Sequence, residues 1–160
     1  MAVLELSALK PALGPGRRLL GLDLGKKTIG LALSDTQLIV ATPLQTLKRG
    51  KFGADAEKLV ALIDQHGVGG VIVGLPLNMD GSEGPSAQSA RAFGRNFARI
   101  SNLPIVLVDE RLSTAAVTRV LLEADTSRAR RAAVVDKMAA GYILQGALDR
   151  MRYLEASRPS

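Results

Sequence analysis

Two apolar runs joined by a short polar connection dominate the first quarter of the sequence. Residues 19–35 read LLGLDLGKKTIGLALSD, which is the pattern of a β-hairpin. Side chains alternate along a strand, so Asp23 lies between Gly21 and Gly25 on one face of the first strand. An ionised carboxylate in an apolar strand costs several kcal/mol if it is unpaired. Asp23 is therefore expected to have a cation, a hydrogen-bond donor or a function.

The simplest partner for Asp23 is one of two lysines in the predicted turn, Lys26 or Lys27. Both lysines lie where they reach solvent more easily than they fold back over the strand. The functional interpretation of Asp23 is therefore favoured over an ion pair.

The rest of the chain alternates between strand and helix patterns. The pattern predicts an edge strand over 37–47 broken by Pro43, a helix over 54–65, a buried strand over 71–75, a helix over 86–100, a buried strand over 105–108, a helix after Ser113 and a last helix over about 132–153. This order predicts an α/β fold with a mixed five-stranded sheet, an antiparallel hairpin side beside parallel strands, flanked by helices. Residues 18–154 form the expected single domain, between a mobile leader over 1–17 and a frayed tail over 155–160.

Composition narrows the chemistry of any site. The 160 residues include no cysteine and one histidine, so carboxylates are the natural metal ligands and a hard ion such as Mg²⁺ or Mn²⁺ is favoured. No apolar run approaches the roughly 20 residues that span a bilayer, and the N-terminus lacks the features of a signal peptide. We expect a cytoplasmic protein with no membrane contact.

The charge balance indicates a polyanionic partner. The net charge is +6 and the isoelectric point is about 10.1, whereas aromatic residues make up only 3% of the chain. Contact with nucleic acid would therefore involve phosphates and shape more than stacked bases.

Three acids are predicted to converge. Asp109 and Glu110 follow the last strand, at the edge of the sheet where α/β sites form, and Asp23 lies late on the first strand. Asp136 belongs to an apolar stripe of the last helix, which also contains Ala139 and Ile143.

Each acid also has a simpler explanation. Asp136 is favourable in a first helical turn without any ligand, and Glu110 has Arg111 and Arg119 as possible ion-pair partners. The combination of three sheet-facing acids favours a metal site. Such a site can hold two Mg²⁺ ions that activate water and stabilise the leaving oxygen in phosphodiester hydrolysis.

Four motifs, in this order, resemble the YqgF/RuvX family. They are Gly21-Leu-Asp-Leu-Gly, the loop that begins Gly74-Leu-Pro-Leu-Asn-Met-Asp-Gly, Asp109-Glu-Arg-Leu-Ser-Thr, and Val135-Asp-Lys-Met-Ala-Ala followed by Ile143-Leu-Gln. The likeness covers roughly residues 18–148, and the combination is highly specific although Asp-x-Gly alone is not. The sequence departs from the family in a longer leader and in Ala116, where relatives often have Glu.

The resemblance implies a ribonuclease H-like fold and a divalent-metal-dependent endonuclease with Asp23, Glu110 and Asp136 as catalytic metal ligands. It leaves open whether Asp109 or Glu110 is the ligand. Members are described as Holliday junction resolvases and as nucleases in maturation of the 16S rRNA precursor, so branched DNA and precursor rRNA are both possible substrates. Symmetric cleavage of a junction would need a homodimer. The candidate nucleic-acid-binding residues are Lys26, Arg128, Arg130 and Arg131, the three arginines preceding the expected last helix.

Two other functions compete with the nuclease. The segment 23–28 also resembles the first phosphate loop of actin and sugar-kinase ATPases, but 160 residues leave no room for their second lobe. A non-catalytic nucleic-acid-binding accessory factor in ribosome maturation or transcription is harder to exclude. Metal-dependent cleavage separates it from the nuclease.

Overall fold

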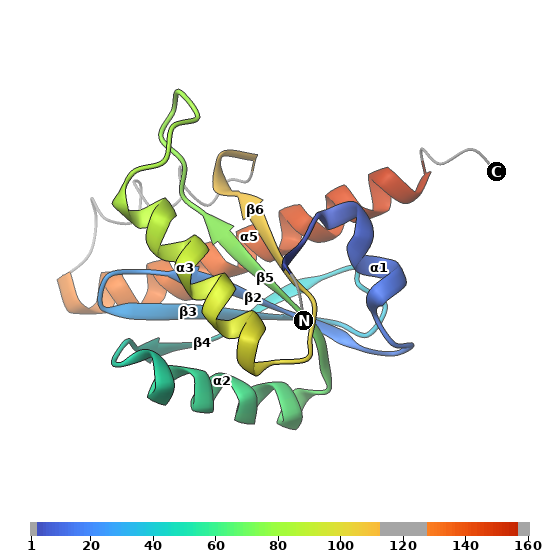
Figure 1. Cartoon of the computed structure of the whole chain (residues 1–160), viewed down its shortest axis with the longest axis horizontal. Helices are drawn as coiled ribbons and strands as arrows, with labels where there is room; N and C mark the ends of the chain where they lie inside the picture. The colour runs from blue at the N-terminus through green and yellow to red at the C-terminus, as the bar shows by residue number, and fades with distance from the viewer. Residues whose placement is uncertain (1–2, 113–127, 157–160) are drawn as a thin grey trace.

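A six-stranded mixed sheet forms the centre of the computed structural model, which describes residues 3–112 and 128–156, without the side chains of 112 and 128–136 (Figure 1). The strands are β1 (Val3–Leu4), β2 (Arg18–Leu24), β3 (Thr28–Ser34), β4 (Ala41–Lys48), β5 (Val68–Leu75) and β6 (Ile105–Asp109). Their order is β1-β6-β5-β2-β3-β4. The β2–β3 and β3–β4 pairs are antiparallel and the other pairs are parallel, which confirms the predicted α/β class and its two-sided sheet.

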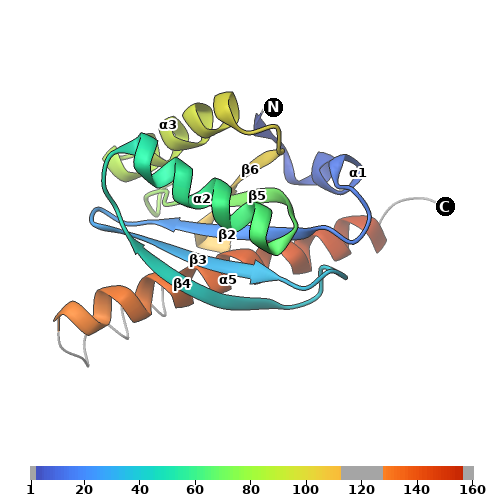
Figure 2. The same cartoon turned by 90° about the horizontal axis from the view of Figure 1, so that it is seen from below.

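Helices cover both faces of the sheet. They are α1 (Leu9–Ala12), α2 (Phe52–His66), α3 (Pro85–Ile100) and α5 (Arg128–Ala156), with short 3₁₀ turns η1 (Leu6–Ala8) and η2 (Glu110–Leu112). Figure 2 shows α2 and α3 on one face and α5 on the other. Alternation along β2 supplies both cores, because Leu20 and Leu22 pack on the α2/α3 side and Leu19 packs on the α5 side.

The hairpin and the edge strand lie where the sequence predicts them. In the hairpin, Asp23 pairs with Gly30 of β3. Strand β4 is the last in the sheet, and Pro43 pairs with Ala32 where the register shifts. Edge strands and register irregularities are among the places where a sheet tolerates the missing N–H of proline.

The last helix is longer than predicted at both ends. It begins at Arg128, so Arg130 and Arg131 lie inside its first turns rather than in a segment before it. It also continues through Ala156, and Glu155 forms an ion pair with Lys10 at 2.6 Å instead of belonging to a frayed tail. This contact with α1 gives the last helical turn a partner that local sequence does not reveal.

The first residues add a sixth strand to the expected five. Strand β1 pairs with β6, and Leu9 is fully buried in the core beneath α5. This differs from a leader without regular structure. A two-residue strand, a 3₁₀ turn and one helical turn show no common period, so their burial depends on the surface that β6 and α5 provide.

The helix predicted after Ser113 falls in 113–127, outside the described residues. Within the described part of the chain, no helix combines the length and the apolar character needed to cross a membrane.

Candidate active site

Asp23 is buried on the α5 side of the sheet. The residue is only 3% exposed and lies one position before the end of β2. Two residues earlier on the same face is Gly21, where a Cβ would lie 2.8 Å from the Cβ of Leu144 in α5. The close approach of the helix encloses Asp23, and no ion pair joins it to Lys26 or Lys27, all three residues being described. The ion pair of Asp23 with Lys26 or Lys27 that the sequence suggests is therefore not formed.

Glu110 is the second buried acid. It directly follows β6, begins η2 and is 5% exposed. A Cβ added to Gly74 of β5 would lie 2.8 Å from Glu110 Oε1 and 2.6 Å from Ile143 Cδ1 of α5. The carboxylate therefore occupies space over the sheet that exists only because residue 74 has no side chain.

Gly74 also links the two acids. Strand β5 lies between β2 and β6, and Gly74 is one residue beyond the Leu22–Val73 pair, beside Asp23. Neighbouring strands are about 4.8 Å apart. Asp23 and Glu110 thus flank one bare position on the same face, at the carboxyl ends of parallel strands, as the sequence predicts.

Asp109 is held by an arginine instead. The Arg111 side chain donates to both Asp109 oxygens, with Nη2 at 2.7 Å from Oδ2, and the Arg111 N–H donates to Oδ1 at 2.9 Å. These hydrogen bonds lower the pKa of Asp109 below its usual value, against a smaller opposing effect of burial. Arg111, suggested by the sequence as a partner of Glu110, thus forms its ion pair with Asp109. Glu110 is left as the buried acid of the motif.

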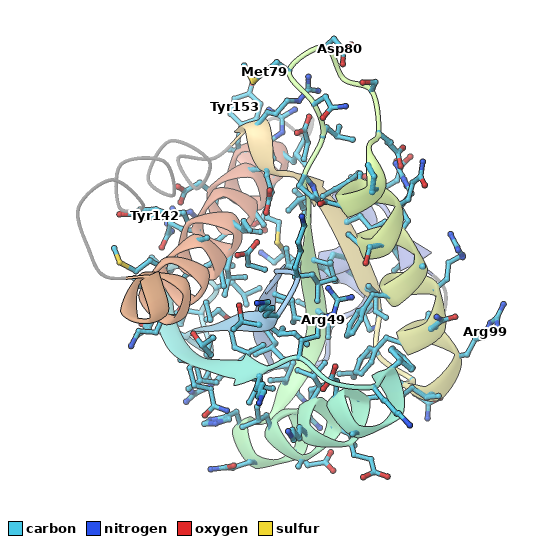
Figure 3. All side chains as sticks on the ribbon, turned by 90° about the vertical axis from the view of Figure 1, so that its left-hand side faces the viewer. Arg49, Met79, Asp80, Arg99, Tyr142 and Tyr153 are labelled. Atoms are coloured by element: carbon cyan, nitrogen blue, oxygen red, sulfur yellow. The ribbon has the colours of Figure 1, made fainter. Side chains whose placement is uncertain are left out.

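Arg111 also fastens a projecting loop to the site. Its Nη1 donates to the carbonyl of Met79 at 3.2 Å, in the loop between β5 and α3. Ser82 closes that loop by accepting from the Asn78 N–H and donating to the Asp80 carboxylate. Figure 3 shows Met79 and Asp80 at its tip, where Met79 is 90% exposed. The loop is an ordered turn, and its backbone is fixed relative to Glu110.

For the third predicted ligand, Asp136, and for the three predicted arginines, the structure describes the backbone only. Asp136, Arg128, Arg130 and Arg131 belong to α5, but their side chains lie outside the described ones. No group of three or more His, Asp or Glu side chains suited to a metal occurs among the described side chains. The buried stripe that follows Asp136 is confirmed, since Ala139, Ala140, Ile143, Leu144 and Ala147 are all buried.

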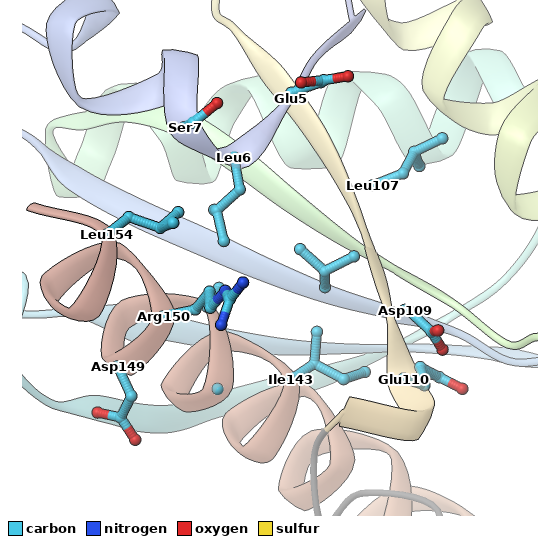
Figure 4. Close-up of a pocket in the computed structure, with 13 residues that line it drawn as sticks. Glu5, Leu6, Ser7, Leu107, Asp109, Glu110, Ile143, Asp149, Arg150 and Leu154 are labelled. Atoms are coloured by element: carbon cyan, nitrogen blue, oxygen red, sulfur yellow. The ribbon is translucent and has the colours of Figure 1, made fainter. Parts of the chain in front are cut away.

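A cleft of about 750 Å³ leads to Asp109 and Glu110 at the end of β6. It lies between β6, α5 and the N-terminal segment, and Asp109 and Glu110 are at one end (Figure 4). Leu107 and Ile143 line its apolar part, and Arg150 reaches into it from α5. Glu110 is buried, but solvent can reach it through the cleft.

Sequence reasoning missed two contributors to this geometry. Gly74 lies in the predicted buried strand and begins the second motif, but its close contact with Glu110 was not predicted, although an isolated glycine inside a strand often indicates a close approach. The role of Arg111 in binding Asp109 and the loop was not predicted. The motif places it two residues after Asp109, but its contact with Met79 joins residues 32 positions apart.

The amino-acid sequence matches the model of a known family over most of its length. The family model described as "RuvX: Holliday junction resolvase" matches residues 17–150. A protein of Paramagnetospirillum magneticum called "Putative pre-16S rRNA nuclease" is 60% identical over 149 residues, covering 93% of this chain and 96% of the relative. A protein of the same description from Beijerinckia indica is 59% identical over 152 residues, covering 95% and 92%.

Among solved structures, "T. thermophilus RuvC in complex with Holliday junction substrate" superposes with a TM-score of 0.53 at 13% identity. The match covers 85% of this chain and 96% of that one. At this identity the likeness shows the fold, which is ribonuclease H-like. The family model, the relatives and the placement of the motif residues agree, and the chain belongs to the RuvX family.

Proposed function

We propose that this protein is a divalent-metal-dependent endonuclease that hydrolyses phosphodiester bonds in structured nucleic acid. The observation that carries the proposal is the pair of buried carboxylates, Asp23 and Glu110, on either side of Gly74 at the carboxyl edge of the sheet. The names of its RuvX relatives, which include nucleases and resolvases, support the same activity.

The donor set fits a hard divalent cation. Two enclosed carboxylates on one face repel each other, and a cation with oxygen preference offsets that repulsion. Asp23 and Glu110, with Asp136 as the predicted third ligand, would hold Mg²⁺ or Mn²⁺, with two ions expected. The metal would activate water and stabilise the leaving oxygen.

The surrounding residues keep the acids in place. Gly74 leaves the space that the Glu110 carboxylate occupies, and Arg111 binds Asp109 so that the chain turns into η2 at Glu110. The carboxyl groups are oriented before a substrate arrives, which lowers the free-energy cost of assembling the site. Lys26 and the three arginines at the start of α5 would contact phosphates.

The 16S rRNA precursor is the proposed substrate, because the relatives at 59–60% identity carry the name of a nuclease acting on it. Such a nuclease would work in the cytoplasm. Branched DNA is the alternative, suggested by the name of the family.

Cleavage assays with matched variants test the proposal. Purified protein is incubated with a 16S precursor fragment and with a four-way DNA junction, in Mg²⁺, in Mn²⁺ and in EDTA. We expect metal-dependent cleavage that Asp23→Asn and Glu110→Gln each abolish. Asp109→Asn is the matched control from the same motif and should keep activity within about tenfold, because the asparagine oxygen can still accept from Arg111 and residue 109 does not face Gly74.

Two outcomes would contradict the proposal. Tight binding without cleavage of either substrate in any metal would indicate the non-catalytic accessory factor. Cleavage that survives Glu110→Gln but not Asp109→Asn would assign the chemistry to the other acid.

A further inference from the structure

Five basic residues gather where the hairpin turn meets the end of β4. Lys26 and Lys27 belong to the β2–β3 turn, whereas Lys48, Arg49 and Lys51 surround the β4–α2 connection. The two segments are hydrogen-bonded, because the Arg49 N–H donates to the Lys27 carbonyl at 2.8 Å. Thr28 pairs with Lys48 just before this contact. Residues that are more than 20 positions apart therefore form one basic surface.

The backbone beneath this surface is fixed by side chains. Arg49 donates through Nη1 to the Gly25 carbonyl at 2.7 Å and through Nη2 to Ser89 Oγ at 3.3 Å, and Figure 3 shows it within the fold. Asp55 is a buried residue, and both oxygens of its carboxylate accept the Gly50 N–H at 3.1 Å. Arg49 is thus occupied in holding the two segments together. The lysines project from a backbone that these hydrogen bonds already hold in place.

The lysine charges have no acidic partners in the described part of the chain. Its ion pairs are Lys10–Glu155, Arg91–Glu83, Arg111–Asp109 and Arg152–Asp149. Lys26, Lys27, Lys48 and Lys51 are all exposed and take part in none of them. Clustered like charges raise the free energy of the folded state unless an anion comes to them.

One lysine of the basic surface, Lys48, lies on the same side of the sheet as Asp23. Asp23 pairs with Gly30, which pairs with Thr46, and Lys48 follows two residues later. Because side chains alternate, Lys48 shares the sheet face of Asp23. Strand β4 is two strands from β2, a lateral separation of about 10 Å. At 3.4 Å of helix axis per nucleotide, that is roughly three nucleotides of a duplex strand.

We propose that Lys26, Lys27, Lys48 and Lys51 form a phosphate-binding surface, the hairpin surface, that holds the nucleic-acid backbone about three nucleotides from Asp23. This proposal rests on the proposed nuclease function. It extends the expected phosphate contacts of the hairpin from Lys26 to three further lysines. The contacts are to phosphates, because the nearby aromatic residue, Phe52, packs edge-on against Phe93 with ring centroids 5.3 Å apart. The surface therefore positions the substrate without reading its sequence.

Binding without cleavage tests the surface separately from the enzyme activity. All variants carry Glu110→Gln, and anisotropy is measured in EDTA with a labelled 16S precursor fragment and a labelled four-way junction between 50 and 200 mM salt. The test variant replaces the four lysines with glutamine. The matched control makes the same charge change at Arg17, Lys58, Arg95 and Arg99, which are exposed and without ion pairs in the described chain.

We expect the test variant to bind at least about tenfold more weakly at the lowest salt. Its log–log salt slope should fall by about 0.9 per lost contact on duplex DNA, so by up to about 3.6. The control should change little, and the melting temperature of the test variant should not fall. Equal losses in both variants, or an unchanged slope in the test variant, would overturn the proposal. Because no cleavage is measured, this result stands whether or not the wild-type protein proves to be a nuclease.

Discussion

The Glu110 carboxylate lies where the side chain of residue 74 would otherwise be. A Cβ at Gly74 would be 2.8 Å from Glu110 Oε1, closer than real Cβ contacts allow. The smallest residue in β5 and the buried acid after β6 therefore depend on each other. This relationship leads directly to a test that leaves every acid unchanged.

Gly74→Ala should reduce cleavage about 100-fold, since a displacement of about 1 Å at a catalytic group has effects of that size. The added methyl group pushes against Glu110 Oε1 and Ile143 Cδ1, both ends of flexible side chains, so we expect a stability loss of only about 1–3 kcal/mol. Single-turnover rates and urea unfolding measure the two effects. Gly94→Ala in α3 is the control, because its Cβ would have only ordinary contacts from 3.4 Å outward. If Gly74→Ala cleaves at the wild-type rate, the position of Glu110 is not important for catalysis.

Metal binding should appear in thermal melts. Neutralising one of several repelling acids relieves repulsion, so Asp23→Asn should be as stable as the wild type in EDTA, or slightly more stable, and should gain less from Mn²⁺. Asp136→Asn should behave in the same way. A buried ion pair predicts the opposite, a loss of about 3–5 kcal/mol in EDTA. That loss, together with an unchanged response to Mn²⁺, would contradict the metal site.

The Asp109–Arg111 pair should contribute stability only at higher pH. The pKa of folded Asp109 is lowered by Arg111, so the contribution is present above the unfolded pKa of about 3.9 and disappears as pH falls through the lower folded value. Asp109→Asn should therefore be less stable than the wild type at pH 7, and the difference should shrink below about pH 4. Urea unfolding across this range measures it. A difference that is constant with pH would refute the charge-based explanation.

Arg128, Arg130 and Arg131 should add phosphate contacts from the start of α5. Figures 1 and 2 place this end of the helix at the same end of the molecule as the hairpin turn. Replacing all three with alanine should weaken binding and lower the salt slope by about 0.9 per lost contact on duplex DNA. An identical salt plot for the variant and the wild type would make them ordinary solvated residues.

A homodimer is expected on branched DNA, because symmetric cleavage needs two sites and each chain supplies one. Sedimentation at micromolar concentration, with and without a junction, should show a species of twice the 16.9 kDa chain mass. A monomer under both conditions would favour the rRNA substrate, which one site is sufficient to cleave.

Local patterns in the sequence determined most of the elements and the direction in which the key residues face. Alternation in β2 placed Asp23 opposite the Leu22 face, and helical spacing identified the buried stripe of α5, since these periods are properties of the backbone itself. Tertiary structure alone decided which distant residues meet. Glu110 lies over Gly74, Asp109 takes Arg111, Leu9 enters the core, and Lys48 joins the hairpin turn, because each contact depends on how strands far apart in sequence are ordered in the sheet. No local period records that order.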